Sequence, residues 1–307
     1  MGISAQLRRF AYPNRWSDLE PMFGLSNKSL SDIGNYVMNI IYENNTHLLF
    51  HLGNLPWLDE NRMRMYAAEA IVIRGGPLHN CWSFIDGTAR AMCRPILNQE
   101  NYYSGHKRFH ALKYQSVVSP DGIIINLQGP YPGRRHDAAI LRESNFHEQL
   151  EQHAVFPNGH SFVVYGDSAY GIRELLLYPF PNTEHVQDEE RGAQQNFNYF
   201  MSVVRQSVEW GFAKIIRDFS FLDFKKNQKL LLQDLGVMYK TGALLTNCLC
   251  CYLCCLYGSE SSQYFQVESP SLETYLIVMG NLARFTVSIH STQSSVEIRN
   301  NDSTLDS

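Results

Sequence analysis

The strongest constraint on the fold is a run of apolar side chains at helical spacing between residues 196 and 219. They recur every three or four residues, which is the period of one face of an α-helix. The members of this stripe are Phe197, Phe200, Met201, Val204, Val208, Phe212, Ile215 and Phe219. The pattern predicts a long helix from about Asn196 to Phe219 with one apolar face.

Short apolar runs upstream of this helix predict strands. The segment NCWSFIDG (80–87) is typical of a strand, and residues 108–129 predict two strands around an SPDG turn. DAAILRESNFHEQL (137–150) predicts a helix, and SFVVYGD (161–167) predicts a fourth strand. The core order is therefore strand, hairpin, helix, strand and long helix, which indicates an α/β fold.

The first part of the chain is predicted to be helical. Trp16, Leu19, Met22 and Phe23 share one helical face, Gly24 ends that helix, and Ser29 can cap a second one. A third helix is predicted over residues 59–73. A partial helix-turn-helix and an ordinary small bundle both fit this pattern.

Three regions are predicted. They are a helical N-terminal region (1–74), an α/β domain (75–258) and a C-terminal extension (259–307). The extension is polar beyond about Gln293, which predicts partial disorder.

Charge and cysteine usage limit the environment and the partners. The formal net charge is −4, so any nucleic acid would have to be bound by local basic patches. Five of the seven cysteines lie within residues 247–258 and lack the spacing of a disulfide framework, which predicts reduced thiols inside a cell. The apolar stretch 242–258 is too short to span a bilayer comfortably, so we expect a soluble protein without a membrane partner.

Three acidic residues stand out by position. Asp86 ends the first predicted strand, Asp167 ends the fourth, and Glu209 borders the apolar stripe of the long helix. Taken singly, each is explained by a turn, a strand exit or a solvated helix face. Together at one end of a sheet they would repel one another, and a divalent metal with oxygen ligands would relieve that repulsion. Such a site supports two-metal phosphodiester chemistry.

An ordered set of segments resembles the Harbinger-type transposase nuclease, a DDE enzyme of ribonuclease-H-like fold. The segments are NCWSFIDGTARAMCRP, YSGHKRFHALKYQSVVSPDG, GPYPGRRHDAAILRES, VVYGDSAYG and RQSVEWGFAKIIRDF. The resemblance covers roughly residues 75–258. It implies a mixed sheet with flanking helices, catalytic Asp86, Asp167 and Glu209, and Asp137 as a further ligand of Mg²⁺ or Mn²⁺. It also implies DNA cleavage by hydrolysis or strand transfer.

The same resemblance carries expectations about partners. Related transposases act on DNA in the nucleus and often with a separate Myb-like DNA-binding protein. They carry a longer N-terminal region before a segment like LRRFAYPNRWSDLEPMFG (7–24), so we expect such a partner here. Whether the chain is also cytoplasmic or forms a homo-oligomer is left open.

Basic residues near the acidic ones suggest phosphate contacts. We expect Lys107, Arg108, Arg134 and Arg135 to bind DNA as a group, the alternative being an ordinary charged surface. Arg205 lies one helical turn before Glu209, where a simple ion pair is the alternative.

Other readings of the same residues remain. One is a domesticated transposase that is catalytically silent and acts as a DNA- or protein-binding module. Another is a serine hydrolase with Ser168 as nucleophile, which would need His185 or His290 as its base. Asp137, just before a predicted helix, could instead cap it.

Overall fold

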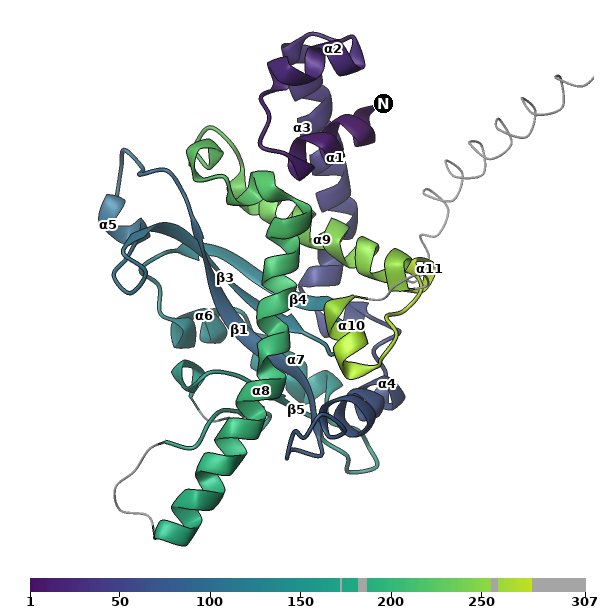
Figure 1. The fold of residues 1–307 in the computed structure, drawn as a ribbon, viewed down its shortest axis with the longest axis vertical. Coiled ribbons are helices and arrows are strands. Elements are labelled where there is room, and N and C mark those ends of the chain that lie inside the picture. Colours follow the sequence, from purple (N-terminus) through teal and green to yellow (C-terminus); the bar gives the residue numbers. More distant parts are fainter. Residues whose placement is uncertain (172, 182–186, 255–258, 278–307) are drawn as a thin grey trace, which may run out of the picture.

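The computed structural model describes residues 1–171, 173–181, 187–254 and 259–277 (Figure 1). The strands are β1 (Cys81–Ala91), β2 (Tyr103–Ser104), β3 (Phe109–Val118), β4 (Ile124–Pro132), β5 (Val163–Tyr165) and β6 (Leu176–Leu177). The longer helices are α1 (Gly2–Ala11), α3 (Asn27–Asn45), α6 (Asp137–Glu143), α7 (Phe146–His153), α8 (Asp188–Asp218) and α9 (Leu235–Cys254). Short helices are α2 (Glu20–Phe23), α4 (Glu60–Arg64), α5 (Gln99–Tyr102), α10 (Glu260–Phe265) and α11 (Leu272–Leu276). Single turns are η1 (Trp16–Leu19), η2 (Thr46–Leu49), η3 (Leu52–Asn54), η5 (Ser168–Tyr170), η6 (Ser220–Asp223) and η7 (Lys225–Asn227), and η4 (Met65–Ile71) is a π-helical continuation of α4.

The strands form one mixed sheet around β1. This strand pairs antiparallel with β3 and parallel with β5, and β3 continues the sheet to β4 and to the short β2. β6 pairs parallel with β5 at the other side. The sheet and its flanking helices confirm the predicted ribonuclease-H-like fold and the predicted order of its core elements.

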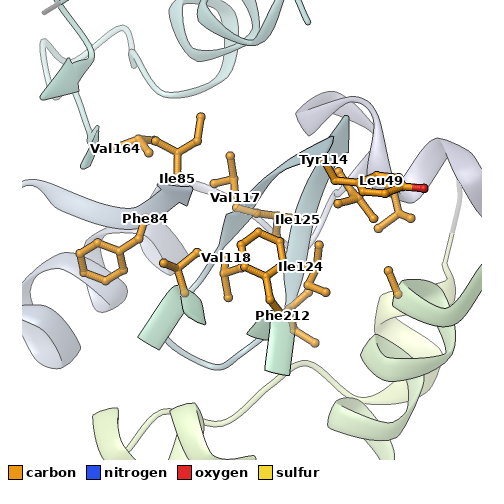
Figure 2. Packing of buried hydrophobic residues seen from close by; sticks show 14 of the residues in the cluster. Leu49, Phe84, Ile85, Tyr114, Val117, Val118, Ile124, Ile125, Val164 and Phe212 are labelled. Atoms are coloured by element: carbon orange, nitrogen blue, oxygen red, sulfur yellow. The ribbon is translucent and has the colours of Figure 1, made fainter. Parts of the chain in front are cut away.

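Helix α8 crosses one face of the sheet and continues beyond its edge (Figure 1). Phe212 on α8 lies beside Val118 of β3, and strand residues alternate between the two faces, with Phe84 and Ile85 on opposite sides (Figure 2). The predicted stripe is buried from Met201 to Phe219, whereas Phe200 is 47% exposed. The helix also begins earlier than predicted, at Asp188. The sequence pattern did not reveal this start because residues 188–195 carry no apolar stripe.

The N-terminal helices form a small core of their own and also pack on the rest of the chain. Ala5, Leu19 and Leu30 make this core, and α3 then runs on to contact α9. Gly24 ends α2 in the left-handed conformation, as predicted. The predicted cap was wrong, because the Ser26 hydroxyl accepts the Ser29 amide and thereby caps α3.

The region after α9 is joined to the sheet by hydrogen bonds. The hydroxyls of Ser259 and Ser269 donate to the carbonyl oxygen of Asp121, at 2.8 and 3.2 Å, and the Asn247 amide donates to the Tyr275 hydroxyl at 2.9 Å. Residues 259–277 are therefore packed against the turn between β3 and β4. The polar tail predicted beyond Gln293 lies outside the described residues. In the part of the chain described, no helix is long and apolar enough to cross a membrane.

Gly211 sets how closely α8 approaches the sheet. A Cβ placed there would lie 3.2 Å from Val118 Cγ2, whereas a Cβ at Gly192, on the same helix, would meet nothing within 4 Å. We expect Gly211→Leu to lower the free energy of unfolding by about 1–3 kcal/mol through overpacking. Gly192→Leu is expected to raise it by about 0.5–1 kcal/mol through helix propensity. Urea unfolding of both variants checks this, and equal stability of Gly211→Leu and wild type would contradict the close packing.

Candidate active site

Two of the acidic residues come from neighbouring parallel strands, Asp86 from within β1 and Asp167 from just beyond the end of β5. Phe84 of β1 pairs with Tyr165 of β5. Asp86 and Asp167 each follow their paired residue by two positions. Strand pairing therefore brings the carboxylates together at the edge where β5 ends. Asp167 follows the end of β5 as predicted. The prediction that Asp86 ends its strand is wrong, because β1 continues to Ala91 and Asp86 pairs with Ser116 of β3 within it.

Glu209 is brought to this edge by α8. It is exposed, while Val208 and Gly211 beside it are buried against the sheet. Arg205, one turn earlier on the helix, lies with its Nη1 3.6 Å from Asp86 Oδ2. The predicted alternative of an Arg205–Glu209 pair is therefore replaced by a pair between the helix and β1.

The electrostatics of Asp86 show that Asp167 and Glu209 both act on its carboxyl. Burial raises the pKa of the Asp86 carboxyl, and the charges of Asp167 and Glu209 raise it further. Arg205 and a 2.8 Å hydrogen bond from the Gly87 amide oppose this shift. Because burial dominates, the pKa stays above its ordinary value.

Asp137 reaches the same edge from α6. His136 occupies the cap position and Asp137 is the first helical residue, so the capping alternative is wrong. Its Oδ1 instead accepts a 3.0 Å hydrogen bond from Lys113 Nζ of β3. A Cβ placed on Gly87, the neighbour of Asp86, would lie 3.1 Å from this Asp137 oxygen.

Tyr170 completes the site and was missed in the sequence. It ends the η5 turn three residues after Asp167, and its side chain is only 4% exposed. Burial raises the pKa of its hydroxyl well above the usual value, and Asp137, Asp86 and Asp167 add to that effect. The spacing to Asp167 in GDSAYG was the available signal, because a one-turn helix brings residues three apart close together.

The donor set at this edge suits a divalent cation. We call Asp86, Asp137, Asp167 and Glu209 the acidic edge; its four carboxylates outnumber the two cations, Arg205 and Lys113, that pair with them. Hard divalent cations take such oxygen ligands. In the described structure, however, no three His, Cys, Asp or Glu side chains stand close enough to hold a metal ion. Asp167 and Glu209 are exposed.

The predicted DNA-binding residues come from two loops at one end of the sheet. Lys107 and Arg108 lie between β2 and β3, and Arg134 and Arg135 follow β4. The Arg134 amide donates to the Asn101 carbonyl at 3.0 Å, which joins the second loop to the chain just before β2. All four side chains are exposed, and Arg135 forms an ion pair with Glu143. We call these four residues the basic patch.

The raised pKa of Asp86 predicts a stability change that depends on pH. Because the native pKa lies above the unfolded one, the charged carboxylate destabilises the native protein near neutral pH. We expect Asp86→Asn to raise the melting temperature at pH 7 in a chelator. The gain should shrink as the pH falls through the native pKa, where wild-type Asp86 takes up its proton.

Thermal unfolding between pH 7 and pH 4 measures this difference. The same change at Asp32, which is exposed on α3, is the control and should leave the melting temperature unaltered. A destabilised Asp86→Asn protein at pH 7 would show that Arg205 stabilises the ionised carboxylate more than burial penalises it.

Comparison with known proteins identifies the family. Neither the curated proteins nor the solved structures contain a match to this chain. The model of a family described as DDE superfamily endonuclease matches residues 85–247, more than half of the 307 residues. The matched region includes all four members of the acidic edge. The chain therefore belongs to the DDE superfamily of endonucleases.

Proposed function

We propose that the protein is a metal-dependent DNA endonuclease of transposase origin, similar to the Harbinger type. The observation that supports this most is the placing of Asp86 and Asp167 on adjacent parallel strands, with Glu209 brought over them by α8. The endonuclease family agrees with phosphodiester cleavage by hydrolysis or strand transfer.

Asp86, Asp167 and Glu209 would hold the metal, with Asp137 as a further ligand. Bound Mg²⁺ or Mn²⁺ supplies an activated water or hydroxyl and stabilises the leaving oxygen. The protein's own contribution is to hold Asp86 rigidly in β1 while Asp167 and Glu209, both exposed, can turn toward a common point. Arg205 and Lys113 neutralise part of the charge at this edge.

The basic patch supports DNA as the substrate. Exposed lysine and arginine side chains position phosphates more often than they read bases. Lys113 and Asp137 connect the patch to the acidic edge, because Lys113 pairs across to β4 and its ammonium group binds Asp137. A nuclear location, a separate Myb-like partner and assembly into a homo-oligomer belong to the same proposal.

A second candidate is a catalytically silent module that binds DNA or protein. It is favoured by the ion pairs that occupy Asp86 and Asp137 and by the distance between potential ligands in the described structure. For the hydrolase alternative, the Ser168 hydroxyl donates to Asp167 Oδ1 at 3.0 Å. The histidines it requires, His185 and His290, lie outside the described residues.

Plasmid nicking tests the proposed chemistry. We expect nicking that requires Mg²⁺ or Mn²⁺ and that is lost in Asp86→Asn, Asp167→Asn and Glu209→Gln, because an amide keeps the shape but not the charge that holds a cation. The matched control is Glu190→Gln, on the first turn of α8 and about 28 Å along the helix from Glu209 at 1.5 Å per residue. It should nick normally.

The alternatives give different results in the same assay. A silent module would bind DNA without nicking it under any metal condition. Activity lost in Ser168→Ala but kept in Asp167→Asn would support the hydrolase, and wild-type nicking by Asp167→Asn would remove the assignment of the three carboxylates.

Salt dependence tests the basic patch. Lys107 and Arg134 are exposed and come from different loops. We choose them because Arg108 has a positive φ (59°) and Arg135 is ion-paired, so replacing those two residues would also change the local structure. We expect the double variant Lys107→Ala/Arg134→Ala to bind duplex DNA more weakly. The plot of log K against log salt should become less steep by about 2, because each phosphate contact contributes about 0.9 to its slope. Fluorescence anisotropy over a salt series measures this.

The control pair is Arg64 and Arg217, both half-exposed and ion-paired to glutamates elsewhere. Replacing these two arginines by alanine should leave the salt slope unchanged. Equal slopes for the two double variants would mean that the basic patch is an ordinary charged surface.

A further inference from the structure

The Tyr170 hydroxyl is a buried polar group directed at the acidic edge. Its oxygen would lie 3.4 Å from a Cβ placed on Gly87, and Asp137 Oδ1 would lie 3.1 Å from the same point. The hydroxyl and the carboxylate therefore both lie next to Gly87, the glycine of β1. Asp86 is the next residue along β1.

This hydroxyl has no hydrogen-bond partner among the residues that the structure describes. Leaving a buried donor unpaired costs free energy, so this hydroxyl calls for an acceptor. The candidate acceptor is the Asp137 carboxylate, whose Oδ1 accepts a hydrogen bond from Lys113 Nζ at 3.0 Å. Ligating carboxylates are commonly held by hydrogen bonds from neighbouring groups.

We propose that Tyr170 is a positioning residue, whose hydroxyl donates a hydrogen bond to the Asp137 carboxylate and orients it toward a divalent cation. This inference rests on the proposed function. When Asp137 turns from Lys113 toward the cation, Tyr170 provides the second contact that fixes the carboxylate. Tyr170 does not itself touch the cation or the DNA.

Gly87 is part of the same arrangement. The absence of a Cβ leaves room for the hydroxyl and the carboxylate to meet above β1. A methyl group there would stand within 3.4 Å of both oxygen atoms and separate them. Gly87→Ala is therefore a second way to remove the contact without altering Tyr170.

The test measures Mn²⁺ binding by calorimetry without DNA, so that the readout does not depend on activity. We expect Tyr170→Phe to weaken Mn²⁺ binding about tenfold, as for other groups that hold a metal ligand. Its melting temperature in chelator should equal or exceed that of wild type, since an unpaired hydroxyl is removed. Gly87→Ala should weaken Mn²⁺ binding in the same direction.

The control is Tyr239→Phe, a buried tyrosine of α9 whose charged neighbours are Arg90 and Asp223 rather than the acidic edge. It should bind Mn²⁺ as wild type does. A double-mutant cycle with Asp137→Asn measures whether the two residues affect Mn²⁺ affinity together. A general packing role of Tyr170 would not produce such coupling. If Tyr170 acts through Asp137, the double variant Tyr170→Phe/Asp137→Asn binds Mn²⁺ no more weakly than Asp137→Asn alone.

The outcomes separate this inference from the proposed function. If wild type binds Mn²⁺ and Tyr170→Phe binds it equally well, the role of Tyr170 is overturned while the metal-dependent nuclease stands. Fully additive losses in the double variant would also overturn it. If wild type binds no Mn²⁺, the proposed function fails and the inference about Tyr170 fails with it.

Discussion

The charge of Asp86, which burial and the nearby Asp167 and Glu209 all oppose, is the constraint around which this site is arranged. Asp86 is partly buried in the central strand, where both burial and its acidic neighbours oppose ionisation. The sheet holds Asp86 and Asp167 side by side through the pairing of β1 with β5, and α8 holds Glu209 above them. The close packing of Gly211 against Val118 keeps that helix on the sheet. Stability from the core thus maintains an arrangement of charge that is unfavourable by itself.

Two cations moderate the charge in different ways. Arg205 comes from α8 and pairs with Asp86, so it links the helix to β1. Lys113 comes from β3 and pairs with Asp137, so it links the sheet to α6. Each cation joins its own element to one that carries a member of the acidic edge, and each stands where a metal ion would compete with it. The metal-free protein is therefore held together at this edge by the same carboxylates that the proposed chemistry needs.

Much of the fold could be predicted because it follows from local periodicity. The apolar stripe predicted α8, and the alternating runs around the SPDG turn predicted the pairing of β3 with β4. The beginning of α8 was missed because residues 188–195 have no apolar face to reveal it. The cap of α3 was placed at Ser29 instead of Ser26, since either serine fits the sequence and only backbone geometry decides between them.

The candidate site was predictable only in part. The positions of Asp167 after a strand and of Glu209 beside the apolar stripe follow from the sequence pattern. Asp86 was placed at a strand end because Asp-Gly is typical of a turn, whereas β1 runs on to Ala91. The resemblance to a family was needed to join Asp137 to these three. The partners of these residues depend on tertiary contacts between β1 and α8 and between β3 and α6, which no sequence spacing reports. Tyr170 was missed although it follows Asp167 by three residues, because an aromatic residue after a strand is usually part of the core.

The central claim is that Asp86, Asp167 and Glu209 surround a divalent cation. Anomalous diffraction from crystals of the protein grown with Mn²⁺ tests it most directly. We expect an anomalous peak at the edge of the sheet, bound by Asp86 and Asp167 with Glu209 or Asp137 completing the ligands, and Arg205 turned away from Asp86. The absence of a peak at this edge at saturating Mn²⁺, with the Arg205–Asp86 pair intact, would contradict the proposed metal site.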